Sequence, residues 1–234
     1  MEKFGYTNAG PRKTNEDYLG YEIFGETGFF CIADGVGGNN CGEYASKFCV
    51  EKFIKKIKEQ QHEALNLKLM MQKVNSELIA EASLKPDCKN MATTFIGVLF
   101  DKKLANIVHT GDSRLYVLRK NGLKQLTEDH TEAKRLVKEG LLTFEASLTY
   151  PRKHILDSAL GMEGDILVTH IQFEYEKMDR FLLATDGCYD VFTKKEIRDI
   201  SITNNVFENF CNSLQERLES KKLKDNATFL AIEI

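Results

Sequence analysis

Three segments typical of β-strands follow one another closely in the middle of the 234-residue chain. They are residues 93–100, 104–109 and 115–119, which are rich in β-branched and aromatic side chains, and Asn121-Gly122 after them signals a tight turn. Further strand-like segments are residues 18–24, 29–33, 166–173, 181–184 and 228–232. Strands that cluster in runs with short loops argue against a regular alternation of strands and helices.

Helical periodicity occurs in pairs of segments. Residues 43–59 and 67–84 each place apolar side chains along one stripe, and residues 194–201 and 206–220 also have a helical pattern. Paired helices and clustered strands together predict an α+β fold in which antiparallel sheets are covered by helices. The chain contains no internal repeat and no linker rich in Pro, Gly or Ser, so we expect one domain over residues 1–234.

Composition excludes several classes of function. The net charge of −3 offers no electrostatic footprint for nucleic acid, and no apolar run approaches the roughly 20 residues that span a bilayer. The N-terminus lacks the apolar core of a signal peptide, so we expect a cytoplasmic protein without a membrane partner. The six cysteines include no C-x-x-C pair, and Cys31, Cys49 and Cys211 lie in apolar patterns. We therefore expect reduced core thiols rather than a disulfide framework or a zinc site.

Acidic residues recur where apolar strands begin or end. The run F-F-C-I-A leads into Asp34-Gly35, I-V-H-T-G into Asp112 and F-L-L-A-T into Asp186, while Asp225 and the pair Glu16-Asp17 stand just before strands. A single Asp-Gly is ordinary turn chemistry. Five acidic positions at strand ends would require five coincidences, so we expect them to form one site.

Carboxylates that cluster raise one another's pKa, and a bound cation resolves that conflict. A site made of carboxylates, carbonyls and water suits Mg²⁺ or Mn²⁺, and two such ions about 4 Å apart activate a water for in-line attack on phosphorus. Gly35 would let the backbone approach and offer its carbonyl, and Gly37 and Gly38 would leave room for a substrate. Arg12, four residues before Glu16, carries a planar guanidinium that fits a phosphate dianion, although a lone Arg near an acid is more often a surface ion pair.

Short motifs occur in a characteristic order over nearly the whole chain. They are R-K-T-N-E-D (12–17), A-D-G-V-G-G (33–38), G-E-Y-A-S (42–46), A-T-T (92–94), G-D-S-R-L-Y (111–116), L-T-E-D-H-T (126–131), A-L-G (159–161), A-T-D-G (184–187) and D-N-A-T (225–228). In this order and spacing the sequence resembles the PPM family of metal-dependent protein serine/threonine phosphatases, the type 2C class, in a bacterial-like form.

The resemblance implies a fold and an activity. The fold would be two packed antiparallel sheets flanked by helix pairs, an α-β-β-α sandwich. The activity would be hydrolysis of phosphoserine and phosphothreonine in proteins, by attack of a metal-bridging water without a covalent intermediate, reversing the action of a cognate serine/threonine kinase. The enzyme would be a monomer that uses two Mn²⁺ or Mg²⁺ ions, with a third ion as a further possibility.

The resemblance also implies roles for particular residues. Asp34 would bridge both metals, Glu16 and the Gly35 carbonyl would bind one ion, and Asp186 and Asp225 would bind the other. Asp17 would act through water, Asp112 would share a third and weaker metal site with Asp186, and Arg12 would bind the substrate phosphate. Residues 127–161, called segment 127–161 below, match a variable flap beside the active site that influences substrate choice.

The sequence departs from the family pattern in the glycine loop and in segment 127–161. Val36 stands where some relatives have a histidine proposed as the general acid, so we expect a metal-bound water to supply the proton. Tyr150-Pro151 replaces His-Pro, and Asp157-Ser158 replaces Thr-Arg. The lost arginine affects contacts of the flap with substrate but not the core metal ligands. For His130 and His154 we expect structural roles.

Three rival interpretations are weaker. A dinucleotide fingerprint would need glycine at position 40, which is asparagine. Cys211 and Arg217 match the Cys-x5-Arg spacing of cysteine phosphatases, but the stretch has no glycine and reads as an amphipathic helix. A catalytically inactive binding module should have lost metal ligands, whereas every core acid is present.

Overall fold

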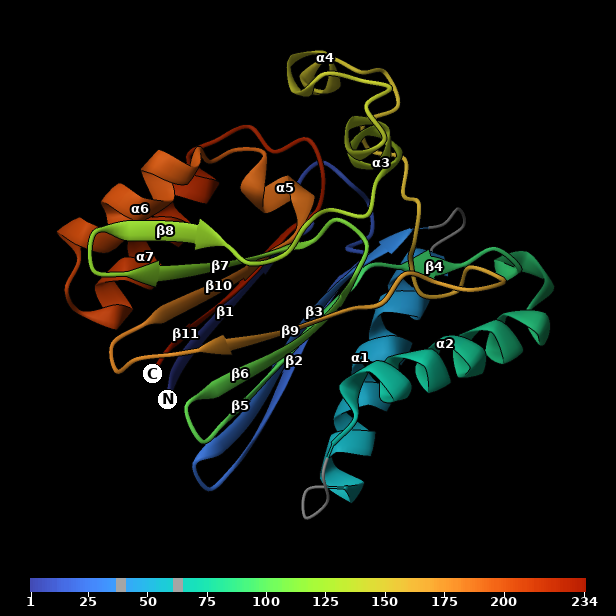
Figure 1. Cartoon of the computed structure of the whole chain (residues 1–234), viewed down its shortest axis with the longest axis horizontal. Coiled ribbons are helices and arrows are strands. Elements are labelled where there is room, and N and C mark those ends of the chain that lie inside the picture. Colours follow the sequence, from blue (N-terminus) through green and yellow to red (C-terminus); the bar gives the residue numbers. More distant parts are fainter. Residues whose placement is uncertain (37–40, 61–64) are drawn as a thin grey trace.

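Two antiparallel β-sheets pack face to face in the computed structural model, which describes residues 1–36, 41–60 and 65–234 (Figure 1). The first sheet has the order β1 (Glu2–Asn8), β11 (Ala227–Glu233), β10 (Arg180–Ala184), β7 (Arg114–Arg119) and β8 (Gly122–Gln125). The second has the order β2 (Asp17–Phe24), β3 (Thr27–Val36), β5 (Phe95–Asp101), β6 (Leu104–Thr110) and β9 (Thr169–Glu174), and β4 (Ala92–Thr93) pairs with β3.

Helices cover the outer face of each sheet. The helices α1 (Cys41–Glu59) and α2 (Leu67–Ser83) lie on the second sheet, and α5 (Asp186–Tyr189), α6 (Lys194–Thr203) and α7 (Phe207–Glu219) lie on the first (Figure 1). A 3-10 turn, Pro86–Cys88, follows α2. The helices α3 (Glu132–Lys138) and α4 (Phe144–Leu148), both in segment 127–161, project from one end of the sandwich. The predicted α+β sandwich is confirmed.

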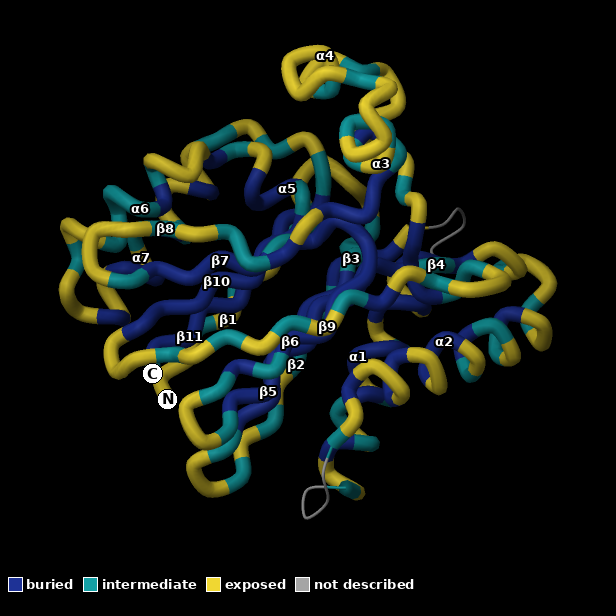
Figure 2. The backbone as a smooth tube through the Cα atoms, viewed as in Figure 1, coloured by how far each residue is buried: buried dark blue, intermediate teal, exposed yellow. Residues whose placement is uncertain are grey.

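The alternation of side chains along β3 explains how the layers are held. Phe29 and Cys31 pack against the helix pair α1/α2, whereas Phe30 and Ile32 pack between the two sheets. The central strands accordingly consist largely of buried residues, drawn in dark blue in Figure 2. Asp34 comes two residues after Ile32 and so lies on the inter-sheet face, at the end of this core.

The strand that contains Asp34 does not end there, which corrects the sequence-based interpretation. β3 continues to Val36: Asp34 lies opposite Asp17 of β2, and Gly35 lies opposite Thr93 of β4. The turn that Asp-Gly commonly forms is absent here because extended partners flank both residues, and Gly35 N–H donates to the Glu16 carbonyl at 3.0 Å. The carboxylate is therefore held within a sheet rather than on a turn.

Other differences concern short elements. The strand expected over residues 93–100 is interrupted at Thr94, and β1, β8 and α3 to α5 were not predicted. Tertiary pairing decides such short segments, because local periodicity over a few residues carries little information. The four predicted helices are present with ends shifted by no more than two residues.

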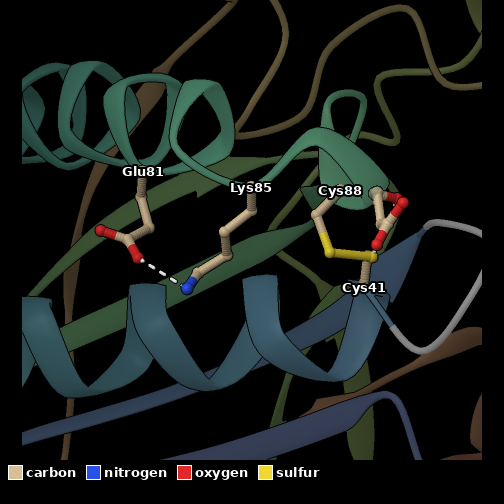
Figure 3. The surroundings of a disulfide bond; sticks show 5 residues. Cys41, Glu81, Lys85 and Cys88 are labelled. Atoms are coloured by element: carbon tan, nitrogen blue, oxygen red, sulfur yellow. Dashed lines mark hydrogen bonds and ion pairs between the residues drawn. A yellow bond between two sulfur atoms is a disulfide. The ribbon is translucent and has the colours of Figure 1, made fainter.

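Cysteine usage also needs a correction. Cys41, at the start of α1, and Cys88, at the end of the 3-10 turn, form a disulfide, with their Cα atoms 5.4 Å apart (Figure 3). They are 47 residues apart, and nothing in their spacing identifies them as partners, because the packing of α2 on α1 brings them together. Cys31, Cys49 and Cys211 are buried free thiols, as predicted, and so is Cys188.

In the described part of the chain, no helix combines the length and the apolar character that crossing a membrane would need.

Candidate metal centre

The predicted site residues converge on one cavity at the end of the sandwich from which α3 projects. The cavity, called the acidic pocket below, measures about 510 Å³. Its lining includes every residue predicted for the site except Asp17, namely Arg12, Glu16, Asp34, Gly35, Asp112, Asp186 and Asp225. The remaining lining residues are Val36, Ala92, Thr94, His154, Ile155, Leu156, Ala159, Met162 and Asn226. Acids spread over more than 200 positions of sequence therefore face one space.

Two threonines, Thr93 of β4 and the following Thr94, hold both the N–H and the carbonyl of Asp34. Asp34 N–H donates to Thr94 Oγ1 at 3.0 Å, and Asp34 carbonyl accepts from Thr93 Oγ1 and from Thr94 N–H, each at 2.9 Å. Thr94 Oγ1 also shares a hydrogen bond of 2.7 Å with the Ser113 hydroxyl. These contacts explain why the strand is interrupted at Thr94. They also fix the carboxylate that the sequence places at the centre of the site.

Asp17 lies behind the pocket, directly across the strand pair from Asp34. Thr185 Oγ1 donates to Asp17 Oδ2 at 2.9 Å, whereas the buried Asp17 Oδ1 has no hydrogen-bond partner among the residues that the structure describes. Burial raises the pKa of Asp17 to about 7. A buried carboxylate oxygen without a partner is costly in a folded protein, unless water or an ion satisfies it.

The loop that carries Glu16 is held by Asn226, which the sequence analysis did not single out. Glu16 N–H donates to Asn226 Oδ1 at 2.8 Å, and Asn226 Nδ2 donates to the carbonyls of Ala9 and Thr14 at 2.8 and 3.1 Å. The hydroxyl of Ser46 donates to the Glu16 carbonyl at 2.6 Å. The only sequence signal for this role is the position of Asn226 in D-N-A-T, next to Asp225.

Glycine is required where β3 passes the start of α1. A Cβ atom at Gly35 would collide with the carbonyl of Gly42, and one at Gly42 would lie 2.7 Å from the carboxyl carbon of Glu16. The backbone of Gly35 thus reaches the pocket because two facing positions lack side chains. Gly37 and Gly38, for which we predicted a space-making role, lie outside the described residues, as does Asn40 of the dinucleotide fingerprint.

Arg12 contacts an acid of the site. Its Nη2 lies 2.7 Å from Asp225 Oδ2, and both side chains are partly exposed. The hydrogen bond with Asp225 raises the pKa of Arg12. Asp225 Oδ1 accepts from the Asn226 N–H at 2.8 Å, so this carboxylate is held in place by its neighbour in the chain.

Asp112, His154 and Asp186 form a further group at the pocket. Each offers a ligand atom, and these atoms lie within 4.8 Å of one another. Asp112 lies between β6 and β7, Asp186 is the first residue of α5, and His154 comes from segment 127–161. His130 does not line the pocket, and its Nε2 lies 2.9 Å from the Thr169 hydroxyl.

Electrostatics favour a cation in the acidic pocket. Burial, followed by the charges of Asp17, Asp186, Asp112 and Asp225, raises the pKa of Asp34 well above its ordinary value. Burial and Asp186 raise the pKa of Asp112 to about 7. The pKa of Glu16 and that of Asp186 are also raised, chiefly by burial. Carboxylates, a backbone carbonyl and one imidazole are donors that Mn²⁺ accepts, and Mg²⁺ accepts the oxygens, so the residues present fit two divalent ions.

The Cys-x5-Arg match does not form a second site. Cys211 and Arg217 lie within α7, and Cys211 is buried in the core beneath the helix. Burial raises the pKa of the Cys211 thiol to about 12. A thiol that is neither exposed nor acidified is a poor nucleophile, which agrees with the expectation from sequence.

Comparisons with known proteins agree with this arrangement. A family model described as protein phosphatase 2C matches residues 5–228. The serine/threonine phosphatase stp of Listeria welshimeri is 31% identical over 229 residues, which cover 95% of this chain and 91% of that protein. PstP of Mycobacterium tuberculosis, a serine/threonine protein phosphatase, is 32% identical over 189 residues, which cover 80% of this chain and 36% of that protein.

Solved structures show the same architecture. The crystal structure of a bacterial serine phosphatase superimposes with a TM-score of 0.90 at 28% identity, covering 100% of this chain and 98% of that one. The catalytic domain of PstP in complex with two manganese ions gives a TM-score of 0.83 at 27% identity, covering 99% of this chain and 97% of that one.

Proposed function

Because the chain belongs to the protein phosphatase 2C family and is a protein serine/threonine phosphatase, we propose that it hydrolyses phosphoserine and phosphothreonine at two Mn²⁺ or Mg²⁺ ions held in the acidic pocket. The observation that supports this most strongly is the convergence of Glu16, Asp34, Gly35, Asp186 and Asp225 on one cavity. Burial and the neighbouring carboxylates raise the pKa of Asp34, and a pair of divalent ions would relieve that repulsion.

The residues divide between the ions in our proposal. Asp34, Glu16 and the Gly35 carbonyl would hold one ion, and Asp34, Asp186 and Asp225 would hold the other. Asp112, with Asp186, provides a third and weaker position, and the imidazole of His154 lies close enough to join it. When bound, the ions supply a water of lowered pKa and stabilise charge on the phosphate oxygens.

Arg12 binds the substrate phosphate in this proposal, and its ion pair with Asp225 sets a condition for that role. A cation bound at Asp225 Oδ2 would compete with Arg12 for that oxygen. The planar guanidinium, already beside the pocket, is then free to bind two phosphate oxygens at once. Metal loading and substrate binding are thus linked through a single side chain.

Proton transfer depends on groups other than Val36, which cannot donate a proton. Asp17 Oδ1, which has no partner among the described residues, would accept a hydrogen bond from a buried water, and Asp17 would act on the site through that water. We infer that water also protonates the departing serine or threonine oxygen, since the alkoxide is a poor leaving group.

The cellular setting is the remaining part of the proposal. Phosphoproteins are the substrates of a protein phosphatase, and a cognate serine/threonine kinase would supply them. We propose a cytoplasmic location, for which the Cys41–Cys88 disulfide is unusual because cytosolic thiols are normally kept reduced.

The test is hydrolysis of a phosphothreonine peptide with Mn²⁺, with Mg²⁺ and with EDTA, together with calorimetric titration of Mn²⁺. We expect turnover that requires a metal and is lost in Asp186→Ala along with metal binding. If the protein bound two Mn²⁺ ions without turnover on any phosphopeptide, it would be a binding module, and the proposed activity would be wrong.

A further inference from the structure

A second cavity, of about 350 Å³, adjoins the acidic pocket. The two share Asp112 and His154 as wall residues, so a ligand in one touches the boundary of the other. Its lining includes residues of segment 127–161, together with Tyr189 of α5 and Lys194 of α6. We call it the cationic pocket because of the side chains described next.

Four cationic side chains line this cavity: Arg114, Lys134, Lys153 and Lys194. Arg114 is neutralised by Asp129, since its Nη2 lies 2.7 Å from Asp129 Oδ2 and its Nε lies 3.0 Å from Asp129 Oδ1. The guanidinium of Arg114 also lies 3.7 Å from the ring centroid of Tyr189, a cation–π contact that helps to hold it in place.

The three lysines have no such partner. Within residues 1–36, 41–60 and 65–234, none of Lys134, Lys153 and Lys194 has a carboxylate within ion-pair distance. Burial and the nearby charges of Arg114 and Lys134 lower the pKa of Lys194, while Asp129 acts in the opposite direction. Three positive charges are thus gathered here without an ion-pair partner among the described residues, in a protein whose net charge is −3.

The acids on the wall do not remove this excess. Asp129 is already engaged by Arg114, and Asp112 lies on the boundary with the acidic pocket, where we propose that it serves a metal. Asp190 is the remaining acid of the lining and is exposed. If Asp112 binds a metal ion, three lysines face the single remaining carboxylate of Asp190.

One wall of the cavity is apolar. Phe144 and Leu148 of α4 are each 57% exposed, and Lys134 Nζ lies 5.9 Å from the Phe144 ring centroid. Large apolar side chains on an exposed helix beside lysines suit a peptide, whose methylene and backbone groups can lie on the apolar wall while an anionic head meets the lysines.

We propose that the cationic pocket binds a second phosphorylated side chain of the substrate, a few residues from the one being hydrolysed. This inference rests on the proposed function, and it names the substrate class: protein segments that carry two neighbouring phosphates. A phosphate dianion matches several unpaired lysines better than a single carboxylate does, because it presents more charge and more acceptor oxygens.

The test compares three phosphothreonine peptides on the Mn²⁺-loaded enzyme. They are identical except at one neighbouring position, which holds alanine, glutamate or a phosphonate analogue of phosphoserine that cannot be hydrolysed, and this position is moved along both sides of the phosphothreonine. We expect the phosphonate peptide to exceed the alanine peptide by about tenfold in kcat/KM at one or two positions, mainly through KM. The glutamate peptide should fall between them.

Variants assign the effect to the cavity. We expect the double variant Lys134→Met, Lys194→Met to reduce the preference from about tenfold to about twofold. The matched control is Lys195→Met, which removes the neighbouring charge on α6, where Lys195 Nζ is paired with Asp199 at 2.8 Å outside the cavity. The control should retain the full preference.

Two results would overturn the inference. One is equal kcat/KM for the three peptides at every position, and the other is an unchanged preference in the double variant. Failure of the proposed function looks different, because no peptide would then be hydrolysed. In that case calorimetric binding of a peptide carrying two phosphonates, with and without the lysine substitutions, still decides whether the cationic pocket takes the second anion.

Discussion

The acidic pocket and the cationic pocket share a wall but are built in opposite ways. The acids of the first project from sheet strands or from residues next to them, with the backbone of Asp34 held by Thr93 and Thr94. The lysines of the second stand at the ends of long side chains, on α3, on α6 and on the loop that contains Lys153, whereas Arg114 of β7 is held by Asp129. The first is positioned by backbone hydrogen bonds and the second by side chains that keep much of their freedom.

In our proposals the acidic pocket performs the chemistry and the cationic pocket recognises the substrate, and the two are built to suit these different tasks. Metal ions demand ligands at set positions, which a sheet supplies. Recognition of a second anion needs only charge nearby, which flexible lysines supply. Changes in the acidic pocket should therefore be severe, and changes in the cationic pocket should be graded. Four experiments, taken from the largest expected effect to the smallest, sharpen or break this contrast.

Replacement of a metal ligand should have the largest effect. Asp186→Asn keeps the shape of the side chain but removes its charge, so we expect kcat/KM to fall by more than about 100-fold and Mn²⁺ affinity to fall with it. Asp165→Asn, an exposed acid outside the acidic pocket, is the control. An unchanged affinity of Asp186→Asn for Mn²⁺ would show that the acidic pocket tolerates loss of a carboxylate. It would contradict the expectation that changes in the acidic pocket are severe.

Loss of the support for Asp34 should come next. Thr94→Val leaves the Asp34 N–H without its acceptor and removes the bond to Ser113. We expect Mn²⁺ affinity to fall by about 10–100-fold, the usual consequence of removing a group that orients a metal ligand. Thr94→Ser keeps the hydroxyl and should restore most of the affinity in the same titration. Equal behaviour of the two variants would mean that the hydroxyl does not position Asp34.

Removal of Arg12 should act on substrate and metal in opposite directions. Without the guanidinium we expect KM for a phosphopeptide to rise by roughly tenfold. Asp225 would lose the cation that competes with the metal, so Mn²⁺ should bind at least as tightly as before. Steady-state kinetics and calorimetry measure the two parts separately. A loss of Mn²⁺ affinity in Arg12→Ala would contradict the proposed exchange.

The pH dependence of stability should give the smallest effect. Asp17 and Asp112 have a pKa of about 7 in the folded chain against an ordinary 3.8, so the folded state holds more protons between these values. Their contribution to stability is therefore complete below about pH 4 and is lost as pH rises through about 7. In EDTA we expect a Tm lower by a few degrees at pH 8 than at pH 5.

Mn²⁺ should remove this dependence, since a bound cation replaces the protons. Thermal melts at both pH values, with EDTA and with Mn²⁺, provide the measurement. A Tm that rises with pH in EDTA would show that the carboxylates do not repel one another in the way described.

The sequence was sufficient to predict the sheet layers and the gathering of the acids, because the signals for both are local. Strand periodicity and the order of short motifs are local signals, and Asp34, Asp186 and Asp225 occur within such motifs. The residues that hold these acids in place could not be identified from the sequence. Asn226 accepts a hydrogen bond from Glu16 N–H across 210 positions, and Thr185 donates one to Asp17 across 168. The Cys41–Cys88 pair was missed for the same reason, because its geometry exists only after the helices pack.

The lysines of the cationic pocket were least accessible to sequence reasoning. Lys134, Lys153 and Lys194 look like ordinary solvated charges until segment 127–161 and α6 are seen to face one cavity. His154 shows the same limit, since we expected a structural role and the structure places its imidazole beside Asp112 and Asp186.

Because Asp17 is paired with Asp34, assembly of the full set of acids depends on the correct register of β2 against β3. Side chains alternate between the faces of a sheet, so a slip of β2 by one residue against β3 would turn Asp17 away from Asp34 and replace it with a neighbour. A misregistered chain could still bury much of its apolar surface, yet it could not assemble the full set of acids. If the acidic pocket binds Mn²⁺ as we propose, the fraction of molecules that bind it tightly would equal the fraction whose β2 and β3 are correctly paired.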